Sequence, residues 1–118
     1  MSVLYGIRQC DTCRKTLKWL EQQGIEHRFH DLRTDGLDAE MIERWLTQLP
    51  LSTLINRRST TWRTLDGTDQ QRLNDGDWRE LLQAHPTLIK RPLLQHEGTL
   101  FIGMGDIQAA DLSVGEPA

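Results

Sequence analysis

Two cysteines three residues apart, Cys10 and Cys13, are the side chains of this sequence best suited to covalent chemistry. A cysteine reacts as its thiolate, and a second thiol one helical turn away can displace whatever the first has bound. The spacing therefore predicts thiol–disulfide exchange, in which Cys10 attacks and Cys13 resolves the mixed disulfide. Arg8, Arg14 and Lys15 flank the pair. Their positive charge favours a thiolate over a thiol.

Two other interpretations fit the same pair. Free cysteine often fills a hydrophobic core, although placement among basic residues argues against that role here. A zinc site would add His27 and His30 to the two cysteines. The spacer of two residues between these histidines is shorter than the usual three to five. We therefore expect no metal.

The cysteines fall where a strand gives way to a helix. Residues 3–5 form a short apolar run that predicts a buried strand. Apolar side chains then recur at helical spacing, at Cys13, Leu17 and Leu20, up to a C-terminal signal at Gly24. A thiol at the start of a helix meets unpaired backbone N–H groups and the positive end of the helix dipole, and both lower its pKa.

The remaining elements complete a mixed sheet. Residues 25–31 alternate like a strand, residues 93–102 read as a hairpin that turns at Glu97–Gly98, and residues 106–112 form a last helix. The block between them is helical, with N-caps predicted at Asp38, Thr68 and Asp77. A strand–helix–strand opening favours a parallel pair with a right-handed crossover. The fold class is therefore α/β.

The composition limits the class of protein. A chain of 118 residues suits one compact domain. Lys and Arg number 14 against 17 Asp and Glu, which argues against direct binding to nucleic acid. No apolar run approaches the roughly 20 residues of a membrane helix, and no secretory leader pattern is visible. Because two cysteines cannot staple a secreted scaffold, we expect a cytoplasmic protein without membrane contact.

Four ordered motifs resemble the arsenate-reductase-like family of thioredoxin-fold proteins, which includes ArsC, Spx and YffB types. They are YGIRQCDTCRK, FHDLRTDGLD, LINRRSTTWRTL and IKRPLL. The match spans essentially the whole chain and is closest to the YffB type. The resemblance implies a thioredoxin-like mixed sheet of four strands with an all-helical insertion between strands 2 and 3. We expect one such domain over residues 1–118, an insertion at roughly 37–85 and a flexible tail at 113–118.

The resemblance also assigns catalytic residues. It implies a cis peptide bond between Arg91 and Pro92 beside the reactive cysteine, with Arg91 facing the same pocket. It places Arg58 near that cysteine as well. Because a guanidinium stabilises a thiolate and binds an oxyanion through two hydrogen bonds, we predict that Arg58 and Arg91 act with Cys10 and Cys13.

Further residues are predicted to bind the substrate: Arg8, Asp11, Thr12, Asn56 and Pro92. Arg8 is a candidate contact for a glutathione carboxylate, and Asp11 and Thr12 shape the loop between the cysteines. Arsenate reductases of the family carry an arginine where Asn56 stands and another near residues 99–103, where this chain has none. Both departures argue against arsenate as the substrate.

The function predicted from the sequence is a thiol–disulfide oxidoreductase. It would draw electrons from glutathione or a glutaredoxin-like partner and act as a monomer on a small anionic or disulfide substrate. We expect no tightly bound cofactor, with glutathione as a co-substrate. The alternatives are an arsenate reductase linked to glutathione and glutaredoxin, and an Spx-like regulator that binds RNA polymerase and uses its CxxC as a redox switch.

Overall fold

The computed structural model describes residues 2–110 and 112. The predicted tail at 113–118 lies outside the described residues. The chain divides into two compact units. The sheet unit comprises Met1–Asp35 and Arg91–Ala118, and the helical unit comprises Gly36–Lys90. A single domain over residues 1–118 stays a prediction.

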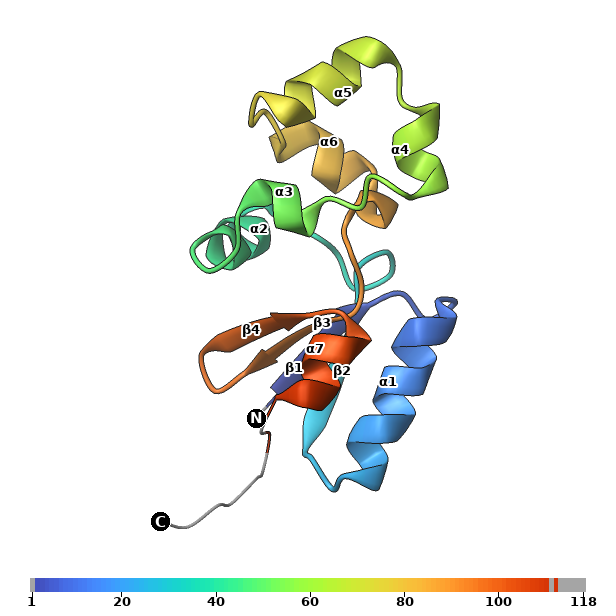
Figure 1. Cartoon of the computed structure of the whole chain (residues 1–118), viewed down its shortest axis with the longest axis vertical. Coiled ribbons are helices and arrows are strands. Elements are labelled where there is room, and N and C mark those ends of the chain that lie inside the picture. The colour runs from blue at the N-terminus through green and yellow to red at the C-terminus, as the bar shows by residue number, and fades with distance from the viewer. Residues whose placement is uncertain (1, 111, 113–118) are drawn as a thin grey trace. The chain divides into compact units, whose positions relative to one another are not determined.

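The sheet unit contains a mixed sheet of four strands in the order β2-β1-β3-β4 (Figure 1). The strands are β1 (Ser2–Gly6), β2 (His27–Asp31), β3 (Leu93–His96) and β4 (Thr99–Ile102). β1 pairs with β2 in parallel and with β3 antiparallel, and β3 pairs antiparallel with β4. The predicted α/β class and the insertion between strands 2 and 3 are therefore confirmed.

The hairpin between β3 and β4 turns where the sequence predicts. Glu97 and Gly98 both have positive φ, at 47° and 84°. Two successive residues of this kind form the turn whose twist matches that of two antiparallel strands. Asparagine or glycine is favoured at such sites, and Gly98 fits the preference.

Two helices, α1 (Asp11–Gln22) and α7 (Met104–Ala109), pack beside the sheet (Figure 1). α1 ends before Gly24, whose φ of 70° suits the left-handed position after a helix. The last helix lies at 104–109, a few residues before the predicted 106–112. One cluster joins strands and helices, and it consists of Leu4, Leu20, Ile25, Leu94, Ile107 and Leu112.

The helical unit consists of short helices. They are α2 (Ala39–Leu46), α3 (Leu51–Leu54), α4 (Thr60–Thr64), α5 (Gly67–Asn74), α6 (Arg79–Ala84) and the 3-10 turn η1 (Pro86–Leu88). Asp38 caps α2 as predicted, through its Oδ1 and the Met41 N–H at 2.9 Å. The predicted caps at Thr68 and Asp77 are wrong. Asp66 caps α5, α6 begins after Trp78, and the Asp77 carboxylate bonds to Arg72 instead.

In the helical unit, an antiparallel β-bridge between Ile55 and Ile89 brings together the ends of the segment that contains α4, α5 and α6. The Asn56 N–H donates to the Leu88 carbonyl at 2.7 Å, and the Lys90 N–H donates to the Leu54 carbonyl at 2.9 Å. These bonds satisfy backbone groups that no helix of the unit could pair.

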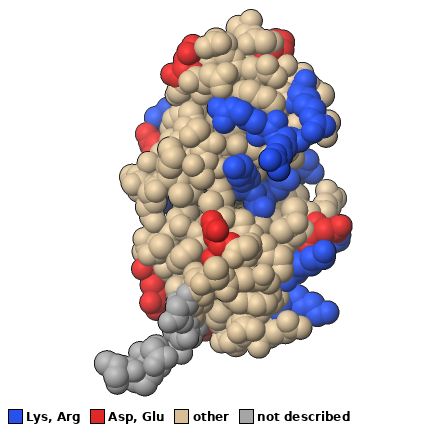
Figure 2. Space-filling view, viewed as in Figure 1, with Lys and Arg blue, Asp and Glu red and all other residues tan. Residues whose placement is uncertain are grey.

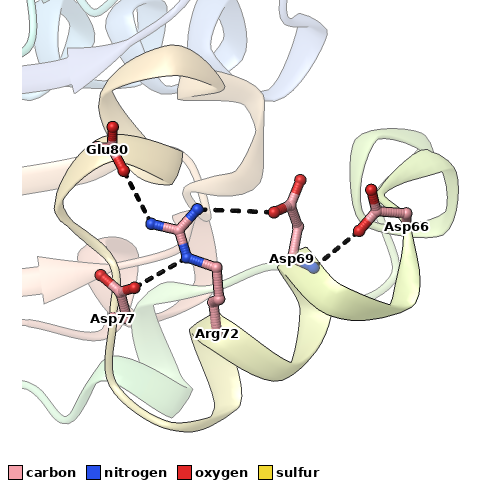
Figure 3. Close-up of polar contacts among 5 residues, drawn as sticks. All are labelled: Asp66, Asp69, Arg72, Asp77 and Glu80. Carbon is pink, nitrogen blue, oxygen red and sulfur yellow. Dashed lines mark hydrogen bonds and ion pairs between the residues drawn. The ribbon is translucent and has the colours of Figure 1, made fainter.

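An ion-pair network links α5 to α6 in the same unit (Figure 3). Arg72 donates from Nε to Asp77 at 2.8 Å and from Nη2 to Glu80 at 2.9 Å, and its Nη1 lies 3.7 Å from Asp69. The hydrogen bonds that Arg72 donates to Asp77 and then to Glu80 raise the pKa of Arg72. Among the described residues, none of the helices has the length and apolar character of a membrane span.

Candidate functional site

Cys10 occupies the N-cap position of α1, in the loop that follows β1. Its backbone is extended, with φ −84° and ψ 121°. The Cys10 N–H donates to the Ile7 carbonyl at 2.9 Å, and the Cys10 carbonyl accepts from the Arg14 N–H at 3.0 Å. The half-buried thiol is thus held at the helix N-terminus, as the sequence predicts.

The surroundings of Cys10 favour its thiolate. Partial burial raises the pKa of Cys10, but the backbone N–H and thiol of Cys13, followed by the Arg91 guanidinium, outweigh this effect and lower the pKa below its ordinary value. N–H donors and a positive group near a thiol stabilise the thiolate more than the neutral thiol, which is why they lower the pKa of Cys10.

Cys13 differs from Cys10 in its burial and in the direction of its pKa shift. Its side chain is buried within the first turns of α1. Burial, and then the neighbouring Cys10, raise the pKa of Cys13 to about 12. A Cβ atom added to Gly6 would lie 2.5 Å from the Cys13 sulfur, so the absence of a side chain at Gly6 lets this thiol pack against β1. The pair thus combines a reactive thiolate with a shielded thiol.

The peptide bond between Arg91 and Pro92 is cis, as the family resemblance implies, and Pro92 is buried. Arg91 is half-buried, and its hydrogen bonding and its charge lower the pKa of the Cys10 thiol. The Pro92 carbonyl accepts the Gly103 N–H at 2.8 Å, which ties this turn to the start of α7.

Asp31 joins the Cys10 loop to the turn after β2. Its Oδ2 accepts the Arg8 N–H at 2.9 Å, and its Oδ1 accepts the Arg33 and Thr34 N–H groups at 2.7 and 3.0 Å. Burial raises the pKa of Asp31, but these three donors and the Arg8 charge outweigh it and lower the pKa below its ordinary value. The buried carboxylate is therefore ionised and fixes the loop that carries Cys10.

A cavity of about 270 Å³ opens beside this loop. Its lining comes from Ile7, Arg8, Gln9, Asp31, Arg33 and Thr34. Arg8 donates to the Thr34 hydroxyl at 3.2 Å, and its guanidinium lies 5.5 Å from the centre of the Phe29 ring. Arg33 donates to the Gln9 side-chain oxygen at 3.3 Å. Two positively charged side chains therefore line the cavity.

The residues between the cysteines face outward. The Asp11 carboxylate pairs with Arg14, whose hydrogen bond and charge lower the pKa of Asp11. Thr12 is exposed and offers its carbonyl to the Thr16 hydroxyl at 2.7 Å. Figure 2 shows basic side chains along the outer side of α1, where Arg14 and Lys15 are exposed. Substrate contacts of Asp11 and Thr12 stay predictions.

Arg58 and Asn56 belong to the helical unit. The Asn56 side-chain oxygen accepts the Arg58 N–H at 3.1 Å, and the Asn56 carbonyl accepts the Ser59 hydroxyl at 2.7 Å. Asn56 thus shapes the turn before α4. The Arg58 side chain is exposed and makes no hydrogen bond or ion pair with another of the residues that the structure describes. Their predicted proximity to Cys10 stays a prediction.

The sequence analysis missed Gly6, Asp31 and the cavity residue Arg33. Two signals could have found them. A glycine at the end of a strand often marks a close approach by another group. An aspartate followed by a polar turn often bonds backbone N–H groups two and three residues ahead. In the part of the chain that the structure describes, no group of three or more His, Cys, Asp and Glu could hold a metal ion.

Comparisons with known proteins cover most of the chain. The sequence model of the ArsC family matches residues 5–111. An uncharacterised protein of Haemophilus influenzae is 43% identical over 106 residues, which are 90% of this chain and 93% of that protein. The solved structure of a YffB protein has a TM-score of 0.87 at 38% identity, with 96% of this chain and 100% of that chain covered.

Relatives with functional names fall into two groups. An arsenate reductase (ArsC) related protein of Brucella melitensis has a TM-score of 0.72 at 41% identity, covering 86% of this chain and 85% of that chain. A global transcriptional regulator Spx of Listeria innocua is 30% identical over 108 residues, which are 90% of this chain and 82% of that protein. A reductase relative and a regulator thus both resemble this chain over most of its length.

Proposed function

The chain belongs to the ArsC family, and we propose on that basis that it is a glutathione-dependent thiol reductase that acts through the Cys10 thiolate. The observation that carries the proposal is the contrast between the two thiols. Cys10 is half-buried with a lowered pKa, whereas the pKa of the buried Cys13 rises to about 12. Such a difference supports Cys10 as the attacking thiolate and Cys13 as a thiol that stays protonated and does not take part in the first attack.

The reaction proceeds by three exchanges of sulfur partners. The Cys10 thiolate attacks a substrate disulfide, so that a new bond forms to one sulfur and the other leaves as a thiolate. A glutathione thiolate then attacks the Cys10 sulfur of this mixed disulfide, which releases the second substrate thiolate and leaves glutathione bound to Cys10. A second glutathione thiolate attacks the glutathione sulfur, forms glutathione disulfide and releases the Cys10 thiolate. Two electrons pass from two glutathione molecules to the substrate disulfide. Arg91 stabilises the Cys10 thiolate as attacker and as leaving group.

Substitution of each cysteine tests this mechanism. Cys10→Ser should abolish glutathione-dependent reduction of a small disulfide, measured by coupling glutathione disulfide formation to glutathione reductase. Cys13→Ser should retain most of the activity, because glutathione can resolve the mixed disulfide from solution. Unchanged activity in Cys10→Ser would sink the proposal.

The pH dependence of alkylation provides a second test. Cys10 should react with iodoacetamide with a midpoint below about 8.5, the ordinary pKa of a cysteine. Arg91→Met should move that midpoint upward, because the guanidinium lowers the pKa of Cys10. Arg28→Met is a matched control, since Arg28 is an exposed arginine on β2. Equal midpoints in the two variants would contradict the role of Arg91.

A regulator is the second candidate, favoured by the 30% identity to the Listeria innocua Spx. In that function the Cys10–Cys13 pair would act as a redox switch for binding to RNA polymerase. Pull-down with RNA polymerase under reducing and oxidising conditions separates the candidates. Binding in one condition with no glutathione-dependent turnover would replace the reductase proposal. Arsenate turnover, assayed with glutathione and glutaredoxin, tests the remaining alternative, which the Brucella melitensis relative supports.

A further inference from the structure

The cavity beside the Cys10 loop lies at the carboxyl ends of β1 and β2. β1 and β2 are parallel, so the loop after Gly6 and the turn after Asp31 emerge at the same edge. The cavity is lined by residues of these two segments alone. Gln9, one of its lining residues, directly precedes Cys10, and the Ile7 carbonyl bonds to the Cys10 N–H. The carboxyl ends of parallel strands are a common location for ligand sites.

The side chains at this cavity suit an anion. Arg8 and Arg33 each carry five N–H donors in a planar fork. Among the described residues, each uses one side-chain donor in a hydrogen bond, Arg8 to Thr34 and Arg33 to Gln9. Both residues are exposed and line the cavity, so the remaining N–H groups of their guanidiniums can meet a carboxylate there.

The Asp31 carboxylate also lines the cavity, but it does not neutralise the rim. Both of its oxygens accept backbone N–H groups, from Arg8, Arg33 and Thr34. The same bonds tie the backbone of Arg8, in the loop after β1, and the backbone of Arg33, in the turn after β2, to one carboxylate. One ionised carboxylate against two guanidiniums leaves the cavity with a net positive charge.

We propose that this cavity binds a carboxylate of the thiol compound that forms the mixed disulfide with Cys10, through Arg8 and Arg33. The inference rests on the proposed function and adds a specificity site to it. Glutathione carries such carboxylates, whereas the neutral compound 2-hydroxyethyl disulfide carries none. The cavity therefore selects the anionic thiol, and the chemistry at sulfur remains with Cys10.

The test compares two disulfides on the same thiolate. Reduced protein is mixed with glutathione disulfide or with 2-hydroxyethyl disulfide, and the rate of Cys10 modification is followed by mass spectrometry. The Cys13→Ser background keeps the adduct on Cys10. The readout is the ratio of the two rates, because a change in Cys10 itself alters both rates equally.

Arg33→Gln and Arg8→Gln should each lower the ratio about tenfold, the size expected for the loss of one charge-assisted hydrogen bond. The reaction with 2-hydroxyethyl disulfide should stay within about twofold of the parent rate. Arg33→Lys should lie between the parent and Arg33→Gln, because it keeps the charge and loses the fork. Lys18→Gln, an exposed change on α1 away from the lining residues, is the matched control for net charge.

The possible results separate the two proposals. An unchanged ratio in both arginine variants, or an equal fall in Lys18→Gln, would overturn the cavity site and leave the reductase proposal intact. A parent protein that glutathione disulfide does not modify at Cys10 would overturn both. A ratio that falls in the arginine variants alone supports the site.

Discussion

Each unit contains one charged side chain that interacts with three polar groups, which are backbone N–H groups in the sheet unit and carboxylates in the helical unit. In the sheet unit, the Asp31 carboxylate is buried and accepts three backbone N–H groups. In the helical unit, the Arg72 guanidinium is one-third exposed and faces three carboxylates on flexible side chains (Figure 3). The first arrangement joins two loops, whereas the second joins the surfaces of two helices.

This comparison shows why the number of ionic contacts is a poor guide to stability. The donors around Asp31 belong to the backbone, so they are already ordered when the loops fold, and they lose their acceptor if the carboxylate is removed. The carboxylates around Arg72 are solvated and lose rotamer freedom when they pair. We therefore expect the Asp31 cluster to contribute more free energy of unfolding than the larger-looking network around Arg72.

Asp31→Ala should have the largest effect on stability. It leaves three backbone N–H groups without their acceptor and should lower the free energy of unfolding by about 3 kcal/mol. Urea unfolding followed by tryptophan fluorescence measures the change. Glu26→Ala, an exposed carboxylate just before β2, is the control and should change stability little. A loss for Asp31→Ala no greater than for Glu26→Ala would contradict the comparison.

The contribution of Asp31 should also depend on pH. Its pKa is lowered in the folded state, so the unfolded chain binds the proton more readily in acid. The stabilisation is therefore present above about pH 4, the ordinary pKa of an aspartate, and is lost as the pH falls through the folded value. The difference in unfolding free energy between the parent and Asp31→Asn should be constant from about pH 5 to 7 and shrink below about pH 4. A difference that grows in acid would contradict this sign.

Gly6→Ala should have the second-largest effect on the free energy of unfolding. Its new Cβ would lie 2.5 Å from the Cys13 sulfur and 3.3 Å from Phe29 Cε1, which is overpacking. Such changes cost about 2 kcal/mol. Cys13→Ala removes the closest contact, so the double variant should recover part of the loss, measured by the same urea transitions. Additive losses would show that the sulfur is not the obstacle.

Arg72→Met should shift the urea midpoint less than Gly6→Ala does. The shift should shrink further at high salt, because screening weakens exposed ion pairs. Measurements at two salt concentrations test this directly. A shift equal to that of Asp31→Ala and insensitive to salt would reverse the ranking of the two clusters.

Gly67→Ala should produce the smallest change and one of opposite sign. Gly67 is the first residue of α5, its φ lies outside the left-handed region, and nothing lies within 4 Å of an added Cβ. Alanine should therefore stabilise the protein by about 0.5 kcal/mol, because it restricts the unfolded chain. The contrast with Gly6 is itself a control, since both variants add one methyl group. Destabilisation by Gly67→Ala would mean that open space around an added Cβ does not predict the effect of alanine at this position.

The features that sequence predicts well are those with local signals. The strand–helix junction at Cys10, the stop at Gly24 and the turn at Glu97–Gly98 each depend on a few adjacent residues, and the structure contains all three. The cis bond before Pro92 came from the family resemblance instead, since an X–Pro pair alone predicts either isomer.

The features that sequence missed depend on which of several possible partners a side chain meets in the folded chain. Asp31 accepts from Arg8, 23 residues earlier, and no local pattern marks that pairing. Thr68 has the side chain of a cap, but Asp66 stands two residues earlier and reaches the Asp69 N–H. The Asp77 side chain could also cap a helix, but it accepts a hydrogen bond from the Arg72 guanidinium instead. Competition between neighbouring candidates is decided by packing, which the local sequence does not contain.

The central position of β1 has a consequence for synthesis on the ribosome. β1 pairs with β2 on one side and with β3 on the other, and β3 lies roughly 90 residues later in the chain. At about 5 to 20 residues per second, β3 emerges roughly 5 to 20 s after β1. Through that interval, the β1 edge that β3 later covers stays unpaired in a completed β1–α1–β2 portion, and an open strand edge is the kind of surface on which nascent chains associate. The helical unit is made within the same interval, so its synthesis sets how long the edge stays open.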